Sequence, residues 1–170
     1  MGSDSIALRL ARLLPQFTIH HFPVDLGAHQ AQSIQRLQTV GPRVPVEVHL
    51  SQPLAAYYAQ QSLPIPQPQT GWALIDTGAS ASAVDRGALQ ALSIQPISTV
   101  QVHTPSGQST QFAHPVRLAF PGTGLPDWPL HSVLGTDLAG QQLLALVGRD
   151  ILRHMVLVYS GVIGVVTLAI

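Results

Sequence analysis

The chain contains no cysteine and very little charge, and both absences limit what it can be. With no cysteine among 170 residues, disulfides and thiol chemistry are excluded, although the compartment is left open. Charged residues make up 9% of the chain, against roughly 25% in soluble proteins generally. The net charge is +0 and there is no basic run, which argues against nucleic acid as a main ligand. So little surface charge also predicts that a partner covers part of an apolar surface.

Long hydrophobic runs are also missing, so we expect no membrane span. The apolar stretch Ile6–Leu14 is interrupted by Arg9 and Arg12, and it therefore lacks the core of a signal peptide. The uncharged tail Met155–Ile170 has 16 residues, fewer than the about 20 that cross a bilayer. We expect a soluble protein and weakly favour the cytoplasm, although the compartment cannot be read from the sequence. A membrane-embedded tail is the alternative.

Glycine and proline are frequent, at 14 each, and favour many short strands and turns over a helical bundle. Val44–Leu50 alternates apolar and polar residues, as a half-buried strand does. Met155–Tyr159 and Val165–Ile170 are β-rich runs on either side of a turn, and they predict a buried C-terminal hairpin. We therefore expect one all-β domain over residues 44–170.

Residues 1–43 form an N-terminal extension without evident chemistry. Ser5–Leu14 and Gly27–Thr39 are candidate helices within it. The extension is either a removable pro-region or an extra layer on the domain. Its three histidines are His20, His21 and His29. Because no cysteine or glutamate accompanies them, we predict no metal site, and nothing in the chain calls for a cofactor.

The segment Ala73–Ser80 reads Ala-Leu-Ile-Asp-Thr-Gly-Ala-Ser, with an ionisable residue directly after an apolar strand. A lone carboxylate removed from water loses several kcal/mol of hydration or shifts its pKa to stay neutral. Of the eight acidic residues in the chain, Asp76 is preceded by the most apolar segment. A strand-end aspartate that caps a turn is the ordinary explanation of such a triplet, and a second segment, Leu146–Leu152, argues against it here.

Leu146–Leu152 reads Leu-Val-Gly-Arg-Asp-Ile-Leu and follows Asp76 at a separation of 72 residues from Asp76 to Gly148. Together the two segments resemble the retropepsin-like aspartic proteases, the single-domain relatives of pepsin. In that family an apolar-Asp-Thr-Gly turn carries the catalytic carboxylate, and a later Gly-Arg-Asp or Gly-Arg-Asn segment opens the one regular helix. The resemblance covers roughly residues 44–168. It implies a closed β-barrel of the acid-protease fold, with one short C-terminal helix, in a two-fold homodimer.

The resemblance also implies a role for each residue of the turn. Asp76 would be catalytic, and Thr77 would bond to the partner chain and keep the two carboxylates nearly coplanar. Gly78 would let substrate backbone pass close, because it has no side chain. Ala79 and Ser80 would face the peptide substrate.

Gly148, Arg149 and Asp150 would be structural. Retroviral members often have an acidic residue where this chain has Ser80, and that residue pairs with the arginine of the Gly-Arg segment. Because this partner is missing, Arg149 needs another, and Asp85 and Asp150 are the candidates.

A β-hairpin is predicted where Thr99–His103 and Ser109–Phe112 alternate around the turn Thr104–Gln108. Its place in the order of elements matches the flap of the family, the hairpin that closes over bound substrate. Four residues at its tip would then contact substrate: Pro105, Ser106, Gly107 and Gln108. An ordinary surface hairpin is the alternative. Further strands are expected at Val116–Phe120 and His131–Leu134.

Residues 51–70 are an insertion relative to the retroviral members, with five glutamines and four prolines. The plain expectation is a solvated loop containing one helical turn. Loops of this length are uncommon unless they are functional or mobile, so a lid near the cleft and a site of self-cleavage are the functional alternatives.

Two carboxylates can hydrolyse a peptide bond together if one carboxylate acts as base and the other as acid, with one proton shared between them. The chain supplies a single Asp-Thr-Gly, so the protease hypothesis requires a homodimer with the site on its axis. Two alternatives stay open. One is a catalytically silent retropepsin-fold module for binding or dimerisation, and the other is an interaction protein held monomeric or latent by residues 1–43 and 51–70.

Overall fold

The computed structural model describes residues 19–23, 30–104 and 107–170, and these ranges are mostly β-strand with a few short helices. Two predicted features lie outside the described residues, namely the helix at Ser5–Leu14 and the hairpin-tip residues Pro105 and Ser106. In the described ranges, no helix combines the length and the apolar character that crossing a membrane requires.

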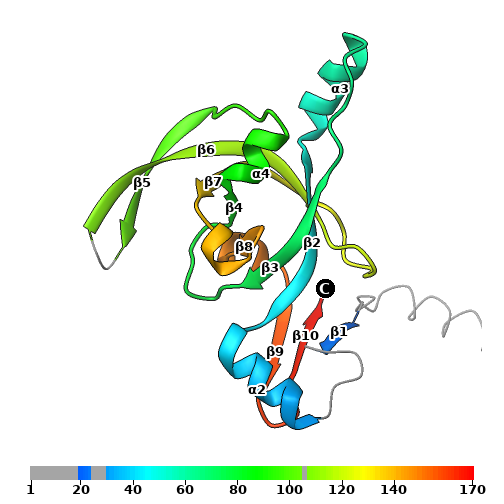
Figure 1. The fold of residues 1–170 in the computed structure, drawn as a ribbon, viewed down its shortest axis with the longest axis vertical. Helices are drawn as coiled ribbons and strands as arrows, with labels where there is room; N and C mark the ends of the chain where they lie inside the picture. Colours follow the sequence, from blue (N-terminus) through cyan, green and yellow to red (C-terminus); the bar gives the residue numbers. More distant parts are fainter. Residues whose placement is uncertain (1–18, 24–29, 105–106) are drawn as a thin grey trace, which may run out of the picture.

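A seven-stranded sheet forms the body of the molecule (Figure 1). Its strands are β2 (Arg43–Leu50), β3 (Gln69–Ile75), β4 (Ala83–Asp85), β5 (Ser98–Thr104), β6 (Gly107–Ala119), β7 (Trp128–Thr136) and β8 (Ala145–Val147). They lie in the order β2-β3-β8-β4-β7-β6-β5, and β2 also pairs with β6. Six strands are therefore joined in a ring of pairings, and β5 lies outside the ring.

Alternation of side chains explains the core inside this ring. The strand predicted at Val44–Leu50 is confirmed as β2, and its burial alternates along the whole strand. Val44, Val46 and Val48 are fully buried, whereas the residues between them are partly exposed. They pack with apolar residues of β3, β6, β7 and β8 in one cluster.

A three-stranded sheet lies beside the body, with β1 (Ile19–Pro23), β10 (Val165–Ala169) and β9 (Val156–Ser160) in that order. The predicted C-terminal hairpin is confirmed, because β9 and β10 pair antiparallel with Val165 opposite Ser160. Its expected burial was wrong for β9, most of whose side chains are exposed. The N-terminal strand β1 joins it, with Ile19 opposite Ala169. Part of the N-terminal extension is thus paired with the C-terminal end of the chain.

The described ranges contain four α-helices, and the last of them is the short C-terminal helix that was expected after Gly148. They are α2 (Gln30–Val40), α3 (Gln52–Gln60), α4 (Arg86–Ala91) and α5 (Arg149–Leu152), together with a 3₁₀ turn, η1 (Ala139–Gln141). The second candidate helix of the extension is confirmed as α2. The one helical turn expected in the insertion is instead the nine-residue helix α3, which projects from the top of the molecule in Figure 1.

The predicted hairpin is also confirmed, and its second strand is longer than expected. β5 and β6 pair from Ser98–Ala113 to Thr104–Gly107. β6 then continues along β7, with a register shift between His114 and Val116. The hairpin and the strand expected at Val116–Phe120 are therefore parts of one bent strand, and the free end of the hairpin extends to the left in Figure 1.

Candidate active site

Asp76 directly follows the last residue of β3, at the point where β8 lies between β3 and β4. β3 and β8 are parallel, with Ile75 opposite Val147. The backbone N–H of Asp76 donates to the carbonyl of Val147 at 2.9 Å. The chain must cross the end of β8 to reach β4, and the turn Asp76–Ser80 makes that crossing.

The carboxylate of Asp76 is held by the backbone of its own turn. Its Oδ1 accepts hydrogen bonds from the N–H of Gly78 at 2.8 Å and of Ala79 at 3.2 Å. A Cβ on Gly78 would lie 3.1 Å from this Oδ1, so glycine leaves room for the carboxylate. Within the described part of the chain Oδ2 has no hydrogen-bond partner, and it is the oxygen that is free for chemistry.

Arg149 holds the same turn from the other side. Its guanidinium donates from Nη1 to the carbonyls of Thr77 at 2.8 Å and Gly78 at 3.0 Å. The carboxylate partners that we expected for it, Asp85 and Asp150, were wrong, because the described hydrogen bonds of Arg149 go to backbone oxygens. A cation that bonds two adjacent carbonyls fixes the turn that carries Asp76.

Asp150 bonds to Ser82, a residue that the sequence analysis missed. Its Oδ2 accepts from the Ser82 N–H at 2.9 Å and its Oδ1 from the Ser82 hydroxyl at 2.7 Å. The Ser82 oxygen in turn accepts the N–H of Gly148 at 3.0 Å. Ser82 is fully buried. No sequence signal distinguishes it, because a serine between two alanines is typical of many strands.

Gly148 is required by close contact between backbones. A Cβ there would lie 2.6 Å from the carbonyl carbon of Ala81, which real Cβ atoms do not tolerate. The N–H of Arg149 also donates to the carbonyl of Ala79 at 3.0 Å. The structure therefore brings Gly148, Arg149 and Asp150 against the segment that follows Asp76.

A cavity of about 430 Å³ opens in front of Asp76. Its floor is the turn, including Gly78, Ala79 and Ser80. Val102 of β5 and Gln111 of β6 line it from the hairpin, and the other lining side chains are mainly apolar: Ala81, Ala83, Leu134, Thr136 and Leu146. Asp76 is the only carboxylate among the described residues that line it.

The hairpin residues that line this cavity differ from those expected at its tip. Gly107 and Gln108 are exposed and are not among the lining residues, whereas Val102 and Gln111 are. A role of Gly107 and Gln108 in substrate binding stays a prediction, and Pro105 and Ser106 lie outside the described residues.

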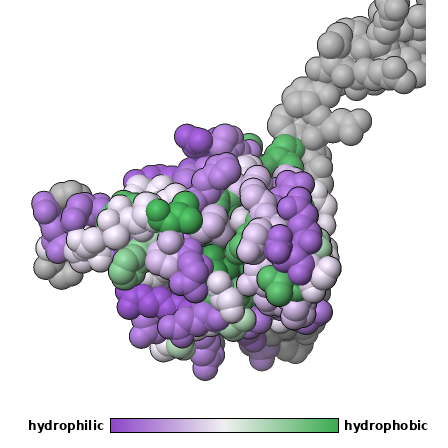
Figure 2. Space-filling model, turned by 90° about the horizontal axis from the view of Figure 1, so that it is seen from above, coloured by the Kyte–Doolittle hydropathy of each residue, from purple (hydrophilic) through white to green (hydrophobic). Residues whose placement is uncertain are grey.

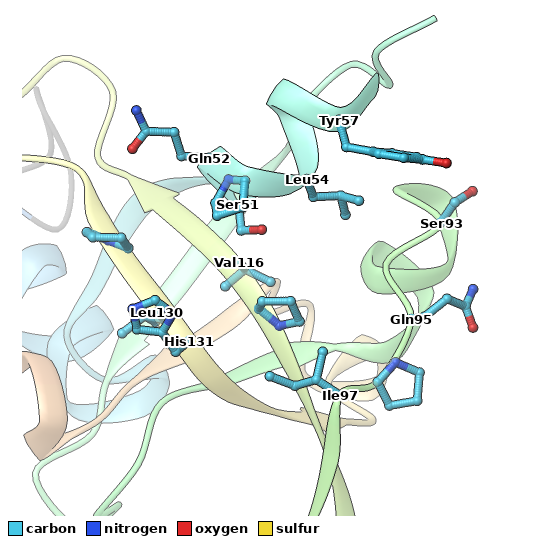
Figure 3. A pocket seen from close by; sticks show the side chains of 14 residues that line it. Ser51, Gln52, Leu54, Tyr57, Ser93, Gln95, Ile97, Val116, Leu130 and His131 are labelled. Atoms are coloured by element: carbon cyan, nitrogen blue, oxygen red, sulfur yellow. The ribbon is translucent and has the colours of Figure 1, made fainter. Parts of the chain in front are cut away.

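A larger groove, of about 710 Å³, lies elsewhere, between α3, residues 93–97 and the strands β6 and β7 (Figure 3). Leu54 and Tyr57 project from α3 towards it. From above, Figure 2 shows hydrophobic side chains in a hollow on this face, with hydrophilic ones around them. His131 is its one titratable side chain besides Tyr57, so Asp76 and its smaller cavity are the better candidate for catalysis.

Among the described residues, no three histidines or carboxylates gather in a way that could hold a metal ion.

Comparisons with known proteins found matches among solved structures alone. No protein-family model matches the chain, and no curated protein matches it. The chain is similar to the solution structure of Simian foamy virus (mac) protease, with 16% sequence identity, coverage of 64% of this chain and 91% of that chain, and a TM-score of 0.39. This similarity is too low to establish a family or an activity.

Proposed function

We propose that the chain is one half of a homodimeric aspartic endopeptidase with a closed β-barrel of the retropepsin-like kind. The observation that carries the proposal is the environment of Asp76. Its carboxylate is oriented by two backbone N–H groups, in a cavity that the β5–β6 hairpin lines from one side. An oriented carboxylate with one free oxygen is suited to binding the water that attacks a peptide carbonyl.

One carboxylate is not enough for this reaction. The attacking water must lose a proton while the leaving nitrogen gains one, and two carboxyls a few Å apart do both by sharing a single proton. Their pKa values then belong to the pair and not to either residue. A second carboxyl must therefore reach the cavity.

The other described carboxylates are engaged elsewhere in the same chain. Asp85 accepts from the N–H groups of Gly87 and Leu138. The remaining pairings are Glu47 with His49, Asp127 with Arg117, Asp137 with the N–H of Ala139, and Asp150 with Ser82. Asp76 of a second copy is the group best suited to complete the site.

Two surface features support a dimer. Thr77 is exposed, and its hydroxyl makes no hydrogen bond within the described ranges, as expected of a side chain that bonds to a partner. β9 is an edge strand whose Val156 and Val158 are 53% and 52% exposed. An apolar free edge normally pairs or is covered.

The remaining roles follow from position. The peptide would run between the hairpin and the turn, where Ala79 and Ser80 face it and Gly78 lets its backbone approach. The apolar side chains of Val102, Leu134 and Leu146 favour apolar residues on either side of the scissile bond. Gly148, Arg149 and Asp150 would keep the turn in place.

The proposal is tested with purified protein and a mixed peptide library at about pH 4 to 6, where one of two paired carboxyls is protonated. We expect cleavage that a pepstatin-type inhibitor blocks and that Asp76→Asn abolishes. Asp137→Asn is the matched control, because this exposed aspartate is not among the residues that line the cavity.

The alternatives give different results. Intact peptides together with a stable dimer would favour the silent binding module. Intact peptides and a monomer would favour the latent interaction protein. Cleavage that survives Asp76→Asn would exclude the proposed mechanism.

A further inference from the structure

A second cavity, of about 520 Å³, lies on the back of the β5–β6 hairpin. Side chains of a strand alternate between its two faces. Gln111 lines the cavity of Asp76, whereas Thr110 and Phe112 line this one. The volume is in the range of small-molecule sites, and Leu89, Ile94 and Phe112 give it apolar walls.

Two nitrogen-bearing side chains meet at Gly135 in this cavity. The Nε of Arg86 donates to the carbonyl of Gly135 at 3.2 Å, which fixes the guanidinium in place. A Cβ on Gly135 would lie 3.0 Å from Nε2 of His114. Arg86 and His114 therefore approach the same residue, one from α4 and the other from β6, and both line the cavity.

The hydrogen bond of His114 determines which nitrogen is available. Its Nδ1 lies 3.3 Å from the carbonyl oxygen of Ile94. A carbonyl only accepts, so Nδ1 carries the proton and Nε2 is left to titrate. Within the described part of the chain, Nε2 has no hydrogen-bond partner.

The described side chains that line the cavity include a positively charged arginine. No carboxylate is among the described residues that line it. Arg86 is the charged group that faces His114 from α4, and β7 and residues 93–96 contribute no titratable side chain. His114 is 8% exposed, and this burial lowers its pKa, so the imidazole tends to be neutral while the cavity is empty. An anion would compensate both groups.

We propose that this cavity binds a small organic carboxylate with a flat apolar body, its carboxylate against Arg86 and His114 and its body between Leu89, Ile94 and Phe112. His114 is also the residue at which β6 leaves the regular register with β7. A ligand there would brace the base of the hairpin on the face opposite Asp76. The inference goes beyond the proposed peptidase activity and does not depend on it.

The test uses benzoate as the probe and nuclear magnetic resonance of the full chain as the readout. Benzoate is expected to shift the signals of Thr110, Phe112 and the His114 ring. It should also raise the pKa of His114, and its affinity should increase as the pH falls through that titration. Benzyl alcohol has the same body without the charge and should bind at least about tenfold more weakly.

Two variants distinguish specific binding of benzoate in this cavity from nonspecific binding to the protein surface. Arg86→Gln should weaken benzoate binding by about tenfold or more, because a charge-assisted hydrogen bond is lost. Arg153→Gln removes an exposed arginine of the α5 end and should leave binding unchanged. Equal binding of benzoate and benzyl alcohol, equal binding to the Arg86→Gln variant, or an unmoved His114 pKa would each overturn the inference. None of these readouts uses peptide cleavage, so the result is independent of the proposed function.

Discussion

Ser82→Ala removes the hydroxyl that connects Asp150 to Gly148 and gives the sharpest test of how the site is held. The change deletes a 2.7 Å hydrogen bond to a carboxylate and leaves the Gly148 N–H without its acceptor. A hydrogen bond to a charged group contributes about 1.5–3 kcal/mol, and a buried N–H left unpaired costs about 1–3 kcal/mol. The Ser82 N–H still bonds to Asp150, so we expect a loss of about 3 kcal/mol of unfolding free energy.

The loss is measured by urea denaturation at one fixed protein concentration, because association would otherwise change the apparent stability. Ser132→Ala is the matched control. Ser132 is exposed on β7, so its replacement should change the unfolding free energy by less than about 0.5 kcal/mol. A loss below about 1 kcal/mol for Ser82→Ala, with an unchanged denaturant slope, would refute the argument that this network holds the turn.

Three further changes test neighbouring parts of the account. Gly148→Ala places a Cβ 2.6 Å from the backbone of Ala81 and should lower the unfolding free energy, measured by urea denaturation, by about 1–3 kcal/mol. Gly140→Ala is the control, because its Cβ meets nothing within 4 Å and should not lower the unfolding free energy. Val158→Lys should convert the proposed dimer to a monomer in sedimentation experiments, because it puts a charge on the apolar edge of β9. Because burial lowers the pKa of His114, its contribution to the unfolding free energy is fully present above the ordinary value of 6.5 and is lost as the pH falls through the folded-state pKa. Urea denaturation at a series of pH values should show this loss of unfolding free energy, and the loss should be smaller in His114→Gln.

Controls for two of these changes lie in the insertion and on β7. Leu63→Lys adds the same charge at an exposed apolar residue away from β9 and should leave the dimer intact. His131→Gln makes the same exchange at an exposed histidine of β7 and serves as the control for His114→Gln. A dimer that persists in Val158→Lys, or an unaltered pH slope in His114→Gln, would contradict the corresponding expectation.

The strands could be predicted because their signal is local. The alternation of apolar and polar residues at Val44–Leu50 indicates a strand with one buried face, whichever elements pack against that face. β6 was divided in two because Pro115 interrupts its pattern. The structure accommodates this proline by a register shift between His114 and Val116, an irregularity of the kind that tolerates proline in a strand.

The parts of the site that could not be predicted depend on backbone groups or on distant contacts. Arg149 bonds to carbonyl oxygens, which every residue has, so no side chain in the sequence marks them as its partners. The pairing of β1 with β10 joins the two ends of the chain and likewise has no local signal. Helix α3 was underestimated because none of its residues is buried, and a helix without a buried face has weak periodicity.

The central claim is that two copies of Asp76 make one catalytic site, and mixing subunits tests it most directly. Wild-type and Asp76→Asn chains are exchanged to equilibrium in varying proportions at constant total concentration, and peptide cleavage is measured. If both carboxyls are required, activity follows the square of the wild-type fraction and falls to about a quarter in an equal mixture. A linear decrease, to about half, would show that each chain works alone and would contradict the account.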